Sequence, residues 1–224
     1  MNTLKMRFKA HVLPMIKTFH KDFIATPFYV LTHALEGSYE LQRYRLGLIR
    51  VATFYLLIES TLIILKFRYT GFLFNTYNVH DFNYVREVLL RLTPYLLFIV
   101  ANWSITTLMD GKGKLRDIYN VIGYALFMRV ILSIVALFMS NVLTLDEAFF
   151  YHGLEFVGFA IMLVMVFTGI MVVHEYSVTK TIFTIIFTFV SAGIMIFIGL
   201  LGFSLIQQVY VFIETIFREI ILRL

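Results

Sequence analysis

The sequence predicts an all-α integral membrane protein built as a five-helix bundle. Its 224 residues are 60% hydrophobic and only 15% charged, and the mean hydropathy is +0.84. Soluble domains average about 45–50% apolar and about 25% charged residues. The apolar residues also occur in blocks of about 20, the length of helix that crosses a bilayer. A short basic loop between the second and third blocks then orients the whole chain.

Three basic residues of this loop lie close to both flanking blocks: Lys112, Lys114 and Arg116. Positive charge at such positions fixes the side of the membrane, so we expect the loop in the cytoplasm. Segments 1–45, 110–117 and 174–181 contain seven, three and one Lys or Arg residues. The opposite side contributes three: Lys66, Arg68 and Arg86. This bias predicts a multi-pass plasma-membrane protein with a cytoplasmic N-terminus and an extracytoplasmic C-terminus.

The net charge of +5 does not indicate nucleic-acid binding, because the basic residues lie at the ends of apolar blocks. We therefore expect the lipid bilayer as a partner, and no nucleic acid. There is no cysteine, which excludes thiolate catalysis and Cys-ligated zinc. Since the sequence also offers no nucleophile–base pair or paired catalytic carboxylates, it predicts a protein that is not an enzyme and has no cofactor.

Residues 1–45 are predicted to be a cytoplasmic basic and amphipathic segment. Within it, residues 1–21 repeat apolar residues at three- and four-residue spacing, which favours a helix resting on anionic lipid headgroups of the inner leaflet. A solvated basic arm is the alternative. After Pro27, a second amphipathic stretch places four apolar residues on one helix face: Phe28, Leu31, Leu35 and Tyr39.

The membrane domain is predicted over residues 46–206, with spans at 46–65, 89–109, 118–139, 154–173 and 182–206. Span five has hydroxyl residues on one face, namely Thr181, Thr184, Thr188 and Ser191, and then Gly193, Gly199 and Gly202. Small and hydroxyl residues favour close helix packing, and a polar permeation path is the alternative. Residues 207–224 should extend this span as an extracytoplasmic amphipathic helix, either on the membrane surface or against a partner.

The predicted spans contain four clear cases of an ionisable residue inside the membrane: Arg50, Glu59, Arg91 and Arg129. Arg50 and Arg91 are near span ends, whereas Glu59 and Arg129 lie roughly 20 Å and 17 Å from the cytoplasmic end at 1.5 Å per residue. We predict an interhelical ion pair between Glu59 and Arg129, with Arg91 as the alternative partner of Glu59. The simplest role of this ion pair is to order the packing of the helix bundle. The alternatives are a role in transport or proton relay, and a Glu59 that is protonated and unpaired.

The basic loop is the second candidate site, with five charged residues: Asp110, Lys112, Lys114, Arg116 and Asp117. It lacks the spacing and the Lys-Ser/Thr ending of a phosphate-binding P-loop. We expect a topology anchor or a docking loop that meets anionic lipid headgroups or an acidic cytosolic partner. On the opposite side lie His80, Asp81, Asp146, Glu147, His152 and Glu155, which could assemble a metal or sugar-binding cluster. Their spacing matches no recognised site, so we expect a solvated rim without metal.

Residues 102–118 read NWSITTLMDGKGKLRDI, and this stretch resembles the signature loop of the Yip family of Ypt/Rab-interacting membrane proteins, in its bacterial branch. Shorter likenesses follow at GYAL (123–126) and HEYS (174–177). The resemblance implies five transmembrane helices with a cytosolic N-terminus. Eukaryotic relatives act in vesicle trafficking and bind Rab-type GTPases, and many bacterial relatives resemble companions of carbohydrate ABC importers.

Together these observations predict a non-catalytic membrane subunit that binds, assembles or stabilises another membrane complex. Through the resemblance, the expected complex is a carbohydrate ABC importer, with its permease subunits as partners. One alternative is a membrane-organising or trafficking-type protein that recruits a cytosolic partner. The other is a small transporter, which would require Glu59 to lie in a water-filled cavity.

Overall fold

The computed structural model describes residues 19–44, 47–78 and 81–223, and every regular element there is helical. A π-helical turn η1 (Lys21–Ala25) precedes the short helices α2 (Thr26–Thr32) and α3 (Ala34–Arg43). The long helices are α4 (Ile49–Tyr69), α5 (Tyr84–Leu108), α6 (Leu115–Met139), α7 (Ala148–His174, after the 3-10 turn η2, Leu145–Glu147) and α8 (Val178–Arg223). The all-α prediction is confirmed. Most of the predicted basic segment 1–21 lies outside the described residues.

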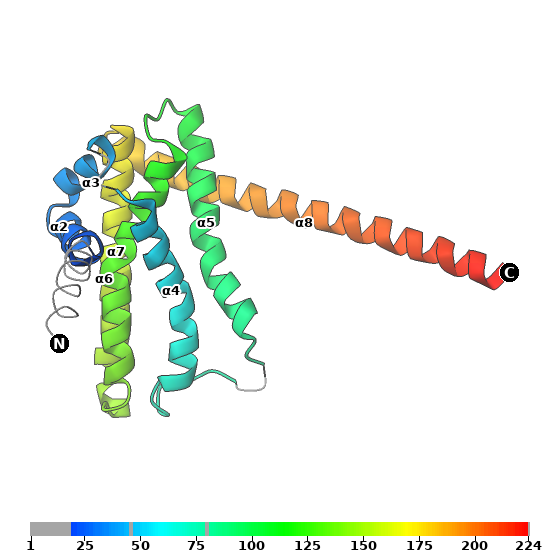
Figure 1. Ribbon diagram of the computed structural model, residues 1–224, viewed down its shortest axis with the longest axis horizontal. Helices are drawn as coiled ribbons and strands as arrows, with labels where there is room; N and C mark the ends of the chain where they lie inside the picture. Colours follow the sequence, from blue (N-terminus) through cyan, green and yellow to red (C-terminus); the bar gives the residue numbers. More distant parts are fainter. Residues whose placement is uncertain (1–18, 45–46, 79–80, 224) are drawn as a thin grey trace, which may run out of the picture.

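Helices α4 to α7 form the body of the molecule, with α6 packed against α4, α5 and α7 (Figure 1). The buried core is concentrated on α6, where Ile118 and Leu126 are fully enclosed. Small residues allow the helices to approach closely. A Cβ atom at Gly123 of α6 would lie 2.4 Å from the Cα atom of Ala52 in α4. The sequence of α6 therefore places its smallest side chain where α4 crosses it.

Four helices are long and apolar enough to cross a membrane: α5, α6, α7 together with η2, and α8. Helix α4 has 21 residues but carries four charged ones: Arg50, Glu59, Lys66 and Arg68. Composition alone therefore does not confirm the predicted count of five spans. The helix also extends past the predicted end at residue 65, so Lys66 and Arg68 belong to it and not to the connection that follows. Of its charges, Glu59 and Lys66 are buried inside the bundle.

Helix α8 is the most unusual element. It is continuous over 46 residues, about 69 Å at 1.5 Å per residue, with no break at the predicted boundary between residues 206 and 207. It leaves the bundle and runs across the direction of α4, α6 and α7, so that the C-terminus lies far from them (Figure 1). Only its first turns pack on the bundle, chiefly on α5, where Asn102 Nδ2 donates a hydrogen bond to Thr188 Oγ1 at 2.9 Å.

The small and hydroxyl residues of α8 divide into two groups. Thr181, Thr184 and Thr188 are completely buried at the start of the helix. A Cβ atom at any of Gly193, Gly199 and Gly202 would have no neighbour within 4 Å. Within the described residues, helix packing is therefore found at the threonines and not at the glycines, because α8 has already left the bundle when the glycines are reached.

Helices α2 and α3 pack on α6 and α7 at the end of the bundle where α6 begins, and Gln42 Nε2 donates a hydrogen bond to the Val173 carbonyl at 3.0 Å. They cross tightly, since a Cβ atom at Gly37 would lie 2.8 Å from the Cα atom of Val30. Three residues of the predicted apolar face are exposed: Phe28, Leu35 and Tyr39. The face that packs inward is instead formed by the residues around Val30 and Gly37, and the predicted face remains available to lipid.

Candidate functional site

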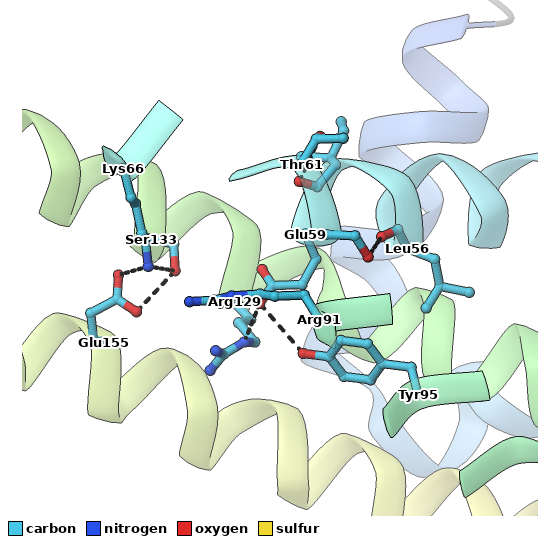
Figure 2. Close-up of polar contacts among 11 residues, drawn as sticks. Leu56, Glu59, Thr61, Lys66, Arg91, Tyr95, Arg129, Ser133 and Glu155 are labelled. Carbon is cyan, nitrogen blue, oxygen red and sulfur yellow. Dashed lines mark hydrogen bonds and ion pairs between the residues drawn. The ribbon is translucent and has the colours of Figure 1, made fainter. Parts of the chain in front are cut away.

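A buried charge network joins α4, α5 and α6 (Figure 2). Arg129 Nε of α6 donates a hydrogen bond to Glu59 Oε1 of α4 at 2.8 Å. From α5, Arg91 Nη1 lies 3.6 Å from the same oxygen, and the Tyr95 hydroxyl donates to it at 3.4 Å. Glu59 is only 1% exposed. The structure thus brings Glu59 together with both partners considered from the sequence, and Arg129 is the closer one.

A second ion pair lies beside the first and adds α7 to the network. Lys66 Nζ of α4 is 2.8 Å from Glu155 Oε1 of α7, and the Ser133 hydroxyl of α6 bridges them, at 3.4 Å from Lys66 and 3.2 Å from Glu155 (Figure 2). Sequence reasoning missed this pair, because it assigned Lys66 to a connection and Glu155 to the solvated rim. A signal was present: Lys66 follows Glu59 by seven residues, two helical turns, and therefore lies on the same face of α4.

The network contains three cations, Arg91, Arg129 and Lys66, and two carboxylates, Glu59 and Glu155. Charges inside a membrane protein are costly unless they are paired, so each carboxylate stabilises a cation contributed by another helix. Arg129 also lies over the ring of Phe159, 5.4 Å from its centre, which is a favourable cation–π distance. One oxygen, Glu59 Oε2, has no hydrogen-bond partner within the described residues. The paired charges come from α4, α5, α6 and α7, so the network can hold these four helices in one relative position.

The basic loop is the second candidate site, and it folds against the end of α7. The backbone N–H of Gly113 donates to His174 Nδ1 at 3.2 Å, and the Tyr176 hydroxyl donates to the Met109 carbonyl at 3.0 Å. Burial raises the pKa of Tyr176, and the nearby Asp110 carboxylate raises it further. The hydroxyl therefore keeps its proton at neutral pH and remains a donor to the loop.

Two glycines allow this close contact. A Cβ atom at Gly111 would lie 2.4 Å from His174 Nδ1, and one at Gly113 would lie 2.3 Å from a methyl carbon of Val173. Real Cβ atoms do not approach other atoms so closely, since interiors are already packed to crystal density. The Asp-Gly-Lys-Gly motif is thus shaped to lie flat on the end of α7.

The charged residues of the loop have different environments. Lys112 forms an ion pair with Glu175, and Asp117 Oδ2 accepts a hydrogen bond from the backbone N–H of Lys114 at 2.9 Å, which caps α6. Arg116 Nη2 donates a hydrogen bond to the Gly47 carbonyl, just before α4, at 3.4 Å. The side chains of Lys114 and Arg116 are exposed. Part of the predicted site therefore holds the loop in place, and the other part presents positive charge on the surface.

The predicted rim residues on the opposite side do not assemble into one cluster. Glu155 belongs to the buried network, and Glu147 accepts hydrogen bonds from the backbone and the hydroxyl of Thr144, which fixes the turn before α7. His80 lies outside the described residues. Among the residues that the structure does describe, no group of three or more His, Cys, Asp or Glu side chains could hold a metal ion.

Four helices long and apolar enough to cross a membrane, with buried charges paired between helices, define an all-helical membrane protein. The sequence matches the family model of the Yip1 domain over residues 28–201, most of its length. The chain therefore belongs to the Yip1 family, a membrane-organising and trafficking family that is not known for enzymes. No curated protein and no solved structure matches the chain. The matched region runs from α2 through the first half of α8.

Proposed function

We propose that this protein is a non-catalytic membrane scaffold that binds and stabilises another membrane complex through α8. The observation that carries the proposal is the exposure of this helix. From Ile194 to Leu222 nearly every large apolar side chain of α8 is exposed, and the helix runs away from the bundle after its first turns. A helix that is apolar on most of its circumference is stable only in lipid or against other protein.

The length of α8 supports a contact with protein as well as lipid. At about 69 Å it is more than twice as long as the roughly 30 Å hydrocarbon core of a bilayer. Its last turns also carry polar pairs, such as Arg218 and Glu214 at 2.6 Å. The C-terminal end of α8 is thus suited to contact with a partner subunit.

The orientation that we propose places the basic loop in the cytoplasm of a plasma-membrane protein. Exposed Lys114 and Arg116 suit anionic lipid headgroups of the inner leaflet, and the exposed apolar residues of α2 and α3 suit the same surface. The likeness of residues 102–118 to the bacterial branch supports permease subunits of a carbohydrate ABC importer as the partner to test first.

A second candidate function is recruitment of an acidic cytosolic partner to the membrane. It is favoured by one observation, the exposed positive charge of Lys114 and Arg116 on a loop held rigidly against α7. A transport role ranks behind both, because Glu59 is enclosed by Arg129, Arg91 and Tyr95.

A photo-crosslinking amino acid placed along α8 tests the scaffold. Phe203 and Phe212 are exposed on the part of α8 that has left the bundle, so crosslinkers there should capture an integral membrane partner in native membranes. Phe127, which is buried in α6, is the matched control and should give no intermolecular product. Products are identified by mass spectrometry after purification in mild detergent.

Permease subunits in the product at both α8 positions would support the scaffold. A cytosolic protein captured from a crosslinker at Lys114, with none from α8, would favour recruitment. Adducts only between two copies of the chain, or no adduct at either α8 position, would contradict a partner on this helix.

A further inference from the structure

We propose that a cleft between the ends of α4 and α6 binds an anionic phospholipid, whose phosphate pairs with Arg68 and whose acyl chain lies on the apolar wall below. The cleft has a volume of about 670 Å³ and lies at the end of the bundle opposite the basic loop. Ligand sites in proteins typically have volumes of about 300–1,000 Å³. The proposal does not depend on a partner for α8.

The floor of the cleft is held in place by contacts between the two helix ends. The backbone N–H of Gly71 donates to Ser140 Oγ at 2.9 Å, and Asn141 Nδ2 donates to the Tyr69 carbonyl at 2.9 Å. A Cβ atom at Gly71 would lie only 2.0 Å from the Ser140 carbonyl oxygen. These contacts join the C-terminal ends of α4 and α6, so the cleft is formed before any ligand binds.

Thr70 and Arg68 are two polar side chains that line the cleft. Thr70 is only 8% exposed, and its hydroxyl Oγ1 has no hydrogen-bond partner in the described part of the chain. Arg68 is exposed and forms no ion pair with the residues described, whereas Lys66, two residues earlier, is paired with Glu155. A buried hydroxyl without a partner is destabilising, and a phosphate or ester oxygen would accept its hydrogen bond.

The walls of the cleft are apolar and determine the class of ligand. Leu65 and Ile134 lie about one helical turn deeper along α4 and α6 than Arg68 and Phe138. Phe138 is 71% exposed at the mouth. The site thus has positive charge at the helix ends and an apolar surface toward the bundle interior. This is the polarity of a lipid molecule, and a free anion would leave the wall uncovered.

Fluorescence quenching by brominated acyl chains tests the proposal. In full-length protein with W103F as the only other change, F138W places one tryptophan at the mouth of the cleft. In vesicles of phosphatidylcholine, a small fraction of brominated phosphatidylglycerol should quench this tryptophan about fivefold more effectively than the same fraction of brominated phosphatidylcholine, as expected for one basic residue at a membrane surface. F72W, whose side chain also lines the cleft, is a second reporter if F138W does not fold.

Three controls make the outcome specific. R68Q should abolish the preference for phosphatidylglycerol, whereas R86Q, which removes the same charge at the same end of the bundle, should leave it intact. F156W, an exposed position on α7, should show no preference. Added inorganic phosphate should not compete, since it lacks an acyl chain. Equal quenching by the two lipids, a preference that survives R68Q, competition by phosphate, or a tryptophan shielded from both lipids would each overturn the proposal.

Discussion

Replacing Glu59 with glutamine should destabilise the protein more than replacing Arg129 with glutamine. The E59Q change leaves Arg129 and Arg91 without their shared carboxylate, whereas R129Q leaves Glu59 beside Arg91 and Tyr95. Breaking a buried pair by removing one partner costs about 3–5 kcal/mol, and we expect E59Q to fall in this range with R129Q below it. The free energy of unfolding in detergent measures both.

The double variant E59Q/R129Q should be more stable than E59Q alone, because only Arg91 then lacks its carboxylate, and its side chain is partly exposed. E214Q is the matched control. It removes one partner of the exposed Glu214–Arg218 pair on α8, which is worth about 0.2–0.5 kcal/mol at most. A double variant no more stable than E59Q would show that Glu59 and Arg129 are not coupled.

The second large effect is expected at Gly123. A Cβ atom there would lie 2.4 Å from Ala52 Cα and 2.8 Å from the Ala52 carbonyl oxygen. Both are backbone atoms, so no side-chain rotation relieves the clash, and α4 and α6 must separate along their contact. G123A should therefore cost about 1–3 kcal/mol or more, measured as a lower free energy of unfolding.

Gly199 supplies the control for this change. It lies in α8 with nothing within 4 Å of its added Cβ atom, and G199A should be neutral or slightly stabilising, since alanine favours a helix more than glycine does. If G123A were as stable as G199A, α4 and α6 would not cross at this position.

The sequence predicted the centre of the charge network better than its edge. Glu59 and Arg129 are deep in apolar blocks, and their similar distances from the cytoplasmic ends of their spans were enough to predict the pair. Lys66 and Glu155 were missed because Lys66 was assigned to the connection after span one and Glu155, at the start of span four, to the solvated rim. Helix α4 continues to Tyr69 and α7 begins at Ala148, so both charges lie inside helices. A charged residue next to an apolar block does not mark the end of a helix when a residue of another helix neutralises that charge.

The direction of α8 could not be predicted from its composition. Hydropathy indicates that a segment can enter lipid, but it does not indicate whether the segment packs inside a bundle or leaves it. The threonines and glycines had the same packing signal, and only the threonines reach α5. Similarly, the charge of the 110–117 loop indicated a surface position, while its contacts with His174 and Tyr176 depend on how α5 and α7 pack.

Thiol labelling tests the central claim, that α4 to α7 cross the membrane with the basic loop in the cytoplasm. The chain has no cysteine, so single substitutions report one position each. Val142 is 84% exposed in the connection after α6, at the opposite end from Lys114. In intact cells a membrane-impermeant maleimide should label V142C, and it should label K114C only after permeabilisation. Labelling of K114C from outside, or of both positions from the same side, would contradict this arrangement.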